Sequence, residues 1–273
     1  MIVEDLDLDR TLSCGQVFRW RKEDGLWKGF MRNRPVTLRQ NGCELDVSGD
    51  VTEEDVRRFF RTDDDLGLIF QDIMISSGDE TVSMILNGNR GLRLVRQDPW
   101  ECSASYILAT FVHIPRIETM IGNVCRAYGE DLGNGSFSFP APGRIAGDPE
   151  AARSCGLGFR CERFVEFARM VDGGEVDFDA LREMEYERCV KELVSLPGIG
   201  EKVADCVSLF ALDHLEAFPV DVWIKRSMKH LFGIEGSYKA VNARSRMLFG
   251  SYAGYAQEYI FLHTRNRAKA LRR

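Results

Sequence analysis

The 273-residue chain lacks several features that would define its class at once. None of its eight cysteines forms a C-x-x-C pair and it has four histidines, a composition that argues against a zinc site. No run of eighteen apolar residues occurs, so we expect no membrane-spanning helix and no membrane partner. The acidic N-terminus has no basic region, so we expect a cytoplasmic protein, or one located with the genome, that is not secreted.

The chain also lacks an excess of positive charge, because its formal net charge is −6. The charge is unevenly distributed. Residues 221–273 carry eleven Lys and Arg against three acids, whereas the first 220 residues carry twenty-five against thirty-nine. Phosphates respond to a local basic face rather than to the total charge, so the composition still permits nucleic-acid binding.

The spacing of apolar residues changes along the chain, from a strand-like pattern to a helix-like pattern. Within residues 1–50 we expect strands at 16–21, 26–30, 34–38 and 43–47, and Asn41-Gly42 is a two-residue hairpin signal. Helix signals begin at Thr52, and the later helices are predicted at 98–109, 161–170, 178–193, 201–212, 222–231, 237–249 and 254–263, with a loop at 133–147. The predicted class is α+β, with an antiparallel sheet domain and flanking helices over 1–95 and a mostly α-helical domain over 96–273.

A turn at Pro197-Gly198-Ile199-Gly200 joins two predicted helices into a helix-hairpin-helix at about 188–212. Glycines let backbone N–H groups approach a phosphate oxygen closely, and the N-terminus of the next helix adds partial positive charge. This pattern predicts a phosphate grip that is independent of base sequence. A simple glycine turn between two packed helices explains the spacing equally well.

Two residues next to this turn indicate chemistry rather than binding alone. Lys202 is followed by an apolar helix, which removes water from the amine and favours the neutral, nucleophilic form. Asp221 follows nineteen residues later and precedes another predicted helix. It is expected to cap that helix and also to stabilise positive charge on a sugar that is losing its base.

Further motifs follow in order along the chain: residues 13–20, 96–99, 156–160, 196–206, 219–222 and 252–257. Together they resemble the helix-hairpin-helix (HhH-GPD) DNA glycosylases with a catalytic lysine, and within that superfamily the eukaryotic-type 8-oxoguanine DNA glycosylases. The resemblance runs nearly end to end. It implies that Lys202 attacks the sugar C1′ and forms a Schiff base, that Asp221 stabilises the developing charge, and that β-elimination then cleaves the strand 3′ to the abasic site.

The resemblance also implies a pocket for the extruded base. The carbonyl of Gly15 would accept the N7–H of 8-oxoguanine and repel the N7 lone pair of guanine. Cys206 and Phe261 would sandwich the base, Gln257 would read its Watson–Crick edge, and Pro219 would line the pocket.

The DNA contacts that the resemblance implies are less well matched. Arg116 and Arg160 match the arginines that hold the opposite cytosine, and Phe159 stands where the family has an aromatic wedge. Phe111 replaces a family asparagine that fills the gap left by the flipped base, so we expect weaker discrimination of the opposite base. Trp223 replaces a histidine that contacts a phosphate.

The expected partner is double-stranded DNA that contains 8-oxoguanine, bound by a monomer in base excision repair. We expect no cofactor and no iron–sulfur cluster, because no cysteine follows Cys206. By resemblance, the carbonyls of Val194, Leu196 and Ile199 would hold a structural Na⁺ or K⁺. Two alternatives stay open: a glycosylase of this superfamily for another damaged base, and a DNA-binding module without catalysis.

Overall fold

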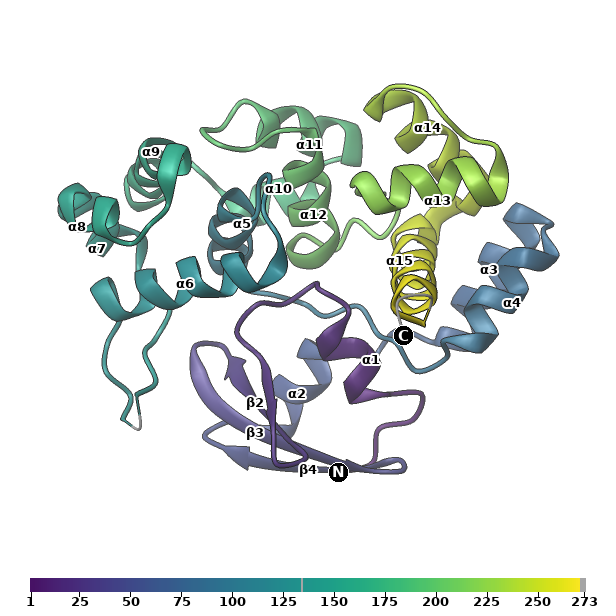
Figure 1. The fold of residues 1–273 in the computed structure, drawn as a ribbon, viewed down its shortest axis with the longest axis horizontal. Coiled ribbons are helices and arrows are strands. Elements are labelled where there is room, and N and C mark those ends of the chain that lie inside the picture. Colours follow the sequence, from purple (N-terminus) through teal and green to yellow (C-terminus); the bar gives the residue numbers. More distant parts are fainter. Residues whose placement is uncertain (134, 271–273) are drawn as a thin grey trace.

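A four-stranded antiparallel sheet forms one end of the molecule in the computed structural model, which describes residues 1–133 and 135–270 (Figure 1). The strands lie in chain order: β1 (Arg21–Glu23), β2 (Leu26–Met31), β3 (Arg34–Asn41) and β4 (Glu44–Gly49). Trp27 of β2 pairs with Leu38 of β3, which pairs in turn with Val47 of β4. The apolar residues of one face are buried and the others are exposed, as the alternation predicts.

The strand expected at 16–21 is wrong. The chain forms helix α1 (Leu8–Ser13) and then crosses to the sheet without strand pairing until Arg21. Gln16 explains the difference, because its side chain takes the place of a neighbouring strand. Its amide donates to the carbonyls of Thr11 and Arg93 and accepts the N–H of Val95.

Helices make up most of the remaining chain. Thr52 and Asp55 form a capping box at the start of α2 (Glu53–Phe59), as the sequence indicates. The other helices are α3 (Leu66–Ser77), α4 (Glu80–Gly88), α5 (Pro99–Leu108), α6 (Ile114–Tyr128), α7 (Pro142–Gly147), α8 (Pro149–Ser154), α9 (Cys161–Asp172), α10 (Phe178–Glu183), α11 (Tyr186–Val194), α12 (Glu201–Ala211), α13 (Val222–Phe232), α14 (Tyr238–Phe249) and α15 (Ala253–Ala270).

Two of these boundaries correct the sequence prediction. The helix expected at 178–193 is split, because Met184 adopts an extended backbone between α10 and α11. The loop expected at 133–147 ends in helix α7, which Pro142 opens at its first turn, where a missing N–H costs nothing. No helix of the described residues is long and apolar enough to span a bilayer.

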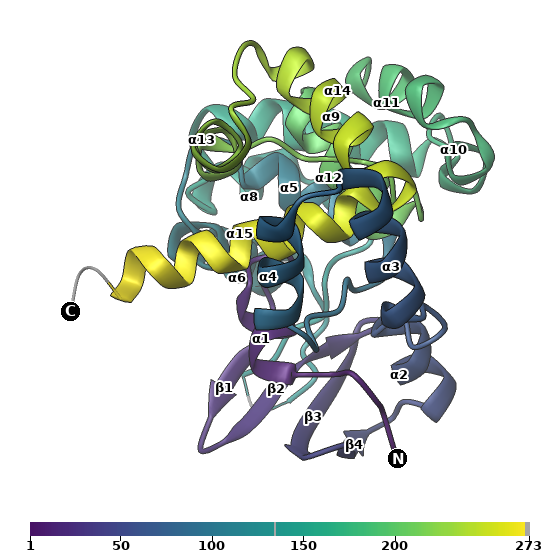
Figure 2. The same cartoon turned by 90° about the vertical axis from the view of Figure 1, so that its right-hand side faces the viewer.

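The described residues form two hydrophobic cores, and the division between these cores differs from the domain boundary expected at residue 95. One core joins the sheet to α1 and α2. The other lies among the later helices and also contains Leu66, Ile73 and Leu86 of α3 and α4. These two helices pack beside α14 and α15 although they precede residue 96, so they belong to the helical body (Figures 1 and 2).

Helix α15 crosses the helical body beside α4, and its C-terminal part projects outward from the body (Figure 2). It contacts α13, α14 and α4. Through its position, α15 brings several of its side chains into the candidate active site.

Candidate active site

The glycine turn lies between α11 and α12, as the sequence predicts. Gly198 has φ +81°, and a Cβ there would lie 3.0 Å from Ile107 and 3.3 Å from Arg163, so a larger residue would strain the turn. Gly200 caps α12 without any side-chain bond to the first turn of that helix. With Pro197 before them, these residues present backbone N–H groups of the kind that bind a phosphate.

Lys202 occupies the first turn of α12, and its Nζ lies 4.9 Å from the centre of the Tyr106 ring. That ring stacks on Phe210, with centroids 5.8 Å apart, and meets Phe18 edge-on at 5.4 Å. The Tyr106 hydroxyl donates to the carbonyl of Gln16. An aromatic face attracts an ammonium group and holds its stem in place, so Tyr106 supports the lysine. The sequence analysis missed Tyr106, because no local pattern marks it.

Asp221 caps α13 and accepts the backbone N–H of Ile224 at 2.7 Å, as predicted. Burial raises the pKa of the Asp221 carboxyl, while the Ile224 N–H and the charge of Lys202 act in the opposite direction. The aspartate and the lysine are therefore electrostatically coupled although they belong to different elements.

The predicted base-pocket residues come from four segments. Gly15 has φ +111°, and a Cβ there would lie 3.7 Å from the Phe261 ring. Gln257 precedes Phe261 by one helical turn on α15, and its side-chain oxygen is buried without a partner among the described residues. Pro219 and Cys206 are buried. A buried amide oxygen without a partner is uncommon, and a ligand with N–H donors would satisfy it.

The properties of Cys206 fit a residue that lines the predicted base pocket rather than a nucleophile. Burial raises the pKa of its thiol to about 12, although the nearby Lys202 acts in the opposite direction. The thiol is therefore protonated near neutral pH and offers a polarisable apolar surface.

Glu258 is a second carboxyl at the site that the sequence analysis missed. It is 6% exposed, and its Oε2 has no partner among the described residues. Burial raises the pKa of Glu258 to about 7; hydrogen bonding to Cys14 lowers it, the charge of Asp221 raises it, and the charges of Lys202 and Arg265 lower it. An acid inside an otherwise apolar helical stretch was the available signal.

This raised pKa predicts the pH dependence of stability. The folded state holds the Glu258 proton more tightly than the unfolded chain, so the stabilisation is fully present below pH 4.5 and is lost as pH rises through about 7. Glu258→Gln should therefore raise the free energy of unfolding at pH 8 by up to roughly 3 kcal/mol, and with it the unfolding midpoint. At pH 4.5 both quantities should change little. Thermal unfolding of both proteins at the two pH values tests this. An equal shift at both would contradict it.

A buried network around Asp205 fixes the catalytic helix and was also missed. The Asp205 carboxylate accepts bonds from the hydroxyls of Tyr186 and Tyr238 and from the amide of Asn242. The same amide donates to the carbonyl of Phe218 at 3.0 Å. The network thus joins α11, α12 and α14 to the segment that leads to Asp221.

Arg116, Phe159 and Arg160, predicted to contact DNA, lie close to Phe111, but Arg160 is buried, at 7% exposure, rather than free on the surface. Arg116 donates to the carbonyl of Gly156, and Arg160 donates to the carbonyl of Thr110. Phe159 and Phe111 are 66% and 94% exposed, and their ring centroids lie 6.4 Å apart.

The Phe111 backbone has φ +56°, which is costly for a bulky side chain. Such strain at an exposed aromatic tip indicates a function there. Trp223 is 37% exposed in the first turn of α13, beside Asp221.

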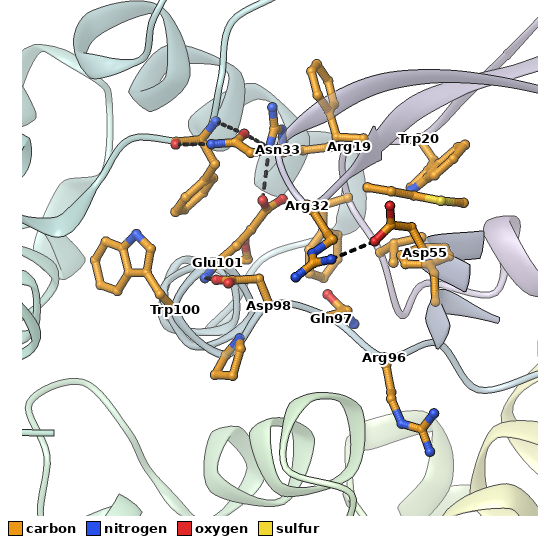
Figure 3. A pocket seen from close by; sticks show the side chains of 18 of the residues that line it. Arg19, Trp20, Arg32, Asn33, Asp55, Arg96, Gln97, Asp98, Trp100 and Glu101 are labelled. Atoms are coloured by element: carbon orange, nitrogen blue, oxygen red, sulfur yellow. Dashed lines mark hydrogen bonds and ion pairs between the residues drawn. The ribbon is translucent and has the colours of Figure 1, made fainter. Parts of the chain in front are cut away.

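A cavity of about 430 Å³ lies elsewhere, between the sheet and the N-terminus of α5 (Figure 3). Its charged side chains are mostly paired: Arg32 with Asp55 at 2.7 Å and Arg19 with Glu101 at 3.0 Å. Lys202 and Asp221 do not line it. The cavity is therefore a polar seam between the sheet and the helical body rather than the reaction site.

Comparison with known proteins agrees with this geometry. Residues 1–102 match the family model for the N-terminal domain of 8-oxoguanine DNA glycosylase. A probable N-glycosylase/DNA lyase of Methanothermobacter thermautotrophicus is 30% identical over 96% of this chain and 95% of its own length. N-glycosylase/DNA lyase OGG1 of Arabidopsis thaliana is 29% identical over 94% of this chain and 77% of its own length.

Among solved structures, the Clostridium acetobutylicum 8-oxoguanine glycosylase/lyase, in complex with duplex DNA containing cytosine opposite 8-oxoguanine, superposes with a TM-score of 0.89. It is 28% identical and covers 96% of this chain and 93% of its own. The α+β class and the family resemblance are thereby confirmed. The chain belongs to the N-glycosylase/DNA lyase family of 8-oxoguanine DNA glycosylases.

Proposed function

We propose that this protein removes 8-oxoguanine from duplex DNA and then cleaves the strand at the resulting abasic site. The observation that carries the proposal is the position of Lys202, two residues beyond a phosphate-binding turn and coupled in charge to Asp221. A non-catalytic DNA-binding module has no need for a lysine held against a buried aromatic ring.

The chemistry follows from these two groups. The neutral amine of Lys202 attacks C1′ of the sugar, and the bond to the base breaks with its electron pair leaving on the base, which is then protonated. The Asp221 carboxylate stabilises the positive charge that develops on the sugar. The sugar ring then opens: the C1′–O4′ bond breaks, O4′ takes up a proton, and the lysine nitrogen loses one, which gives the Schiff base. The Schiff base makes the C2′ proton acidic, and loss of that proton expels the 3′ phosphate.

Base selection rests on the pocket. Guanine presents a lone pair at N7, whereas 8-oxoguanine presents N7–H, so an accepting carbonyl at Gly15 favours the lesion. The unpartnered oxygen of Gln257 suits the N–H donors of the Watson–Crick edge. Phe261 and Cys206 supply the two faces of the pocket, and Pro219 supplies its wall. All these groups belong to one chain, so the proposed active unit is a monomer.

The hairpin would hold a phosphate of the lesion strand. The backbone N–H groups of Gly198 and Gly200 would supply the grip, because the N–H of Ile199 is bonded within the turn, and Trp223 offers a further indole N–H. Carbonyls of Val194, Leu196 and Ile199 are oxygen donors suited to an alkali cation. The Leu196 carbonyl already accepts the N–H of Ile199 at 3.2 Å, which leaves one lone pair for the ion.

The direct test uses duplexes that differ only at one base. We expect excision from a duplex with 8-oxoguanine opposite cytosine, and a covalent adduct after borohydride reduction, but neither from the duplex with guanine. An adduct with an oxidised pyrimidine and none with 8-oxoguanine would contradict the proposed substrate but agree with the proposed Schiff-base mechanism. Binding to the duplex without excision and without an adduct would support the alternative of a DNA-binding module without catalysis.

Phe111 predicts relaxed discrimination of the opposite base. Its ring has no donor or acceptor with which to read cytosine, and stacking tolerates every base. We expect excision rates opposite C, A, G and T to lie within about tenfold of one another, since each lost base contact is worth about 1–3 kcal/mol. Single-turnover rates on four duplexes test this. Strong preference for cytosine alone would refute it.

A further inference from the structure

Arg265 connects the end of α15 to the turn that contains Gly15. Its Nη1 donates to the carbonyls of Ser13 and Cys14, both at 2.8 Å. These carbonyls stand at the C-terminus of α1, where main-chain acceptors lack helical partners and a cation is favoured. One guanidinium thus satisfies two acceptors immediately before Gly15.

The other side of the turn is fixed independently. Gln16 is 1% exposed, and its side chain makes three hydrogen bonds to the backbone at Thr11, Arg93 and Val95. Gly15 therefore lies between Gln16, which is held by the loop from 93 to 95, and the Ser13–Cys14 carbonyls, which are held by Arg265. Gly15 itself has a left-handed backbone and no side chain, so it makes no side-chain contact that could hold its carbonyl in place.

Helix α15 also carries the other base contacts. Gln257, Phe261 and Arg265 follow one another at intervals of four residues, so they share one face of the helix. A Cβ at Gly15 would lie 3.7 Å from both Phe261 and Arg265. One rigid helix therefore provides the amide, the aromatic ring and the anchor of the carbonyl.

We propose that Arg265 is a positioning residue for lesion recognition, which holds the Gly15 carbonyl at a fixed place relative to Gln257 and Phe261. The inference rests on the proposed function, since it concerns how the same pocket distinguishes 8-oxoguanine from guanine. Recognition through one N7–H depends on the position of a single acceptor, and displacements of about half an ångström weaken such a site. The Schiff-base chemistry at Lys202 does not use this carbonyl.

The experiment compares two reactions of each variant. Single-turnover excision of 8-oxoguanine requires the base to be recognised, whereas strand cleavage at a preformed abasic site does not. We expect Arg265→Ala to slow excision on the order of tenfold, corresponding to 1.4 kcal/mol, and to change abasic-site cleavage less than about twofold. Arg265→Lys should restore most of the excision rate, because its ammonium also reaches carbonyl acceptors as a multiple donor.

Arg267→Ala is the matched control, because Arg267 is an exposed arginine two residues further along the same helix. It removes the same charge near DNA without touching the Gly15 turn, and both of its rates should stay within about twofold of wild type. All assays are run well below the lowest unfolding midpoint. If Arg265→Ala does not fold, Arg265→Gln, which keeps a shorter donor, replaces it.

Three results would overturn the proposal: unchanged excision in Arg265→Ala, an equal loss of both reactions, or no recovery with lysine. A simple helix cap would produce the first or second result together with a lower unfolding midpoint. If the wild-type protein cleaves abasic DNA but excises no 8-oxoguanine, the proposed function fails instead.

Discussion

Lys202→Gln is expected to abolish the covalent adduct with 8-oxoguanine DNA under borohydride and to slow excision at least about a thousandfold, as loss of a catalytic nucleophile does in other enzymes. Glutamine keeps much of the side-chain length and the helix but has no amine to form an imine. The remaining rate reflects binding and the stabilisation that Asp221 provides. The adduct is followed by gel shift and the excision by strand cleavage after alkali.

The control for this prediction is Lys28→Gln. Lys28 is an exposed lysine of β2 that pairs with Glu23 at 2.9 Å, so its loss should leave both readouts near wild type. DNA affinity of Lys202→Gln should also remain close to wild type, because the hairpin N–H groups are retained. An adduct that persists in Lys202→Gln would show that another amine is the nucleophile.

Asp205→Ala is expected to lower the unfolding free energy by about 3 kcal/mol or more. The change leaves two tyrosine hydroxyls and one amide without their acceptor, and each buried group left unsatisfied costs about 1–3 kcal/mol. Burial raises the pKa of Asp205 to about 6, while its bonds from Tyr186 and Tyr238 oppose this rise. Urea unfolding at pH 7.5 measures the loss.

The same change should reduce excision more than the loss of folded protein explains. The network reaches the carbonyl of Phe218, three residues before Asp221, so its loss frees the aspartate to move relative to Lys202. Asp179→Ala is the control, because this exposed carboxylate pairs with Arg182 on the surface and should contribute less than about 1 kcal/mol. A loss below 1 kcal/mol in Asp205→Ala would contradict the structural role of the network.

Local signals in the sequence predicted the place of the glycine turn accurately. The turn at 197–200, the lysine after it and the cap at Asp221 all depend on residues within a few positions, where backbone geometry and helix capping operate. The Thr52 cap and the hairpin between β3 and β4 were predicted for the same reason, although Asn41 pairs with Glu44, so the two loop residues are Gly42 and Cys43 rather than Asn41 and Gly42. The strand expected at 16–21 failed because the bonding partners of Gln16 lie at 93 and 95, far along the chain.

The sequence alone thus supplied the residues of the proposed chemistry, which are Lys202, Asp221 and the glycine turn, together with motifs that resemble those of the family. The tertiary structure decided which contacts hold these residues in place relative to one another. The packing of α3 and α4 on the helical body, the network around Asp205 and the burial that raises the pKa of Glu258 all follow from contacts between distant segments. Arg265 and Ser13 are 252 residues apart, and no local pattern relates them, because only the fold brings the last helix against the first.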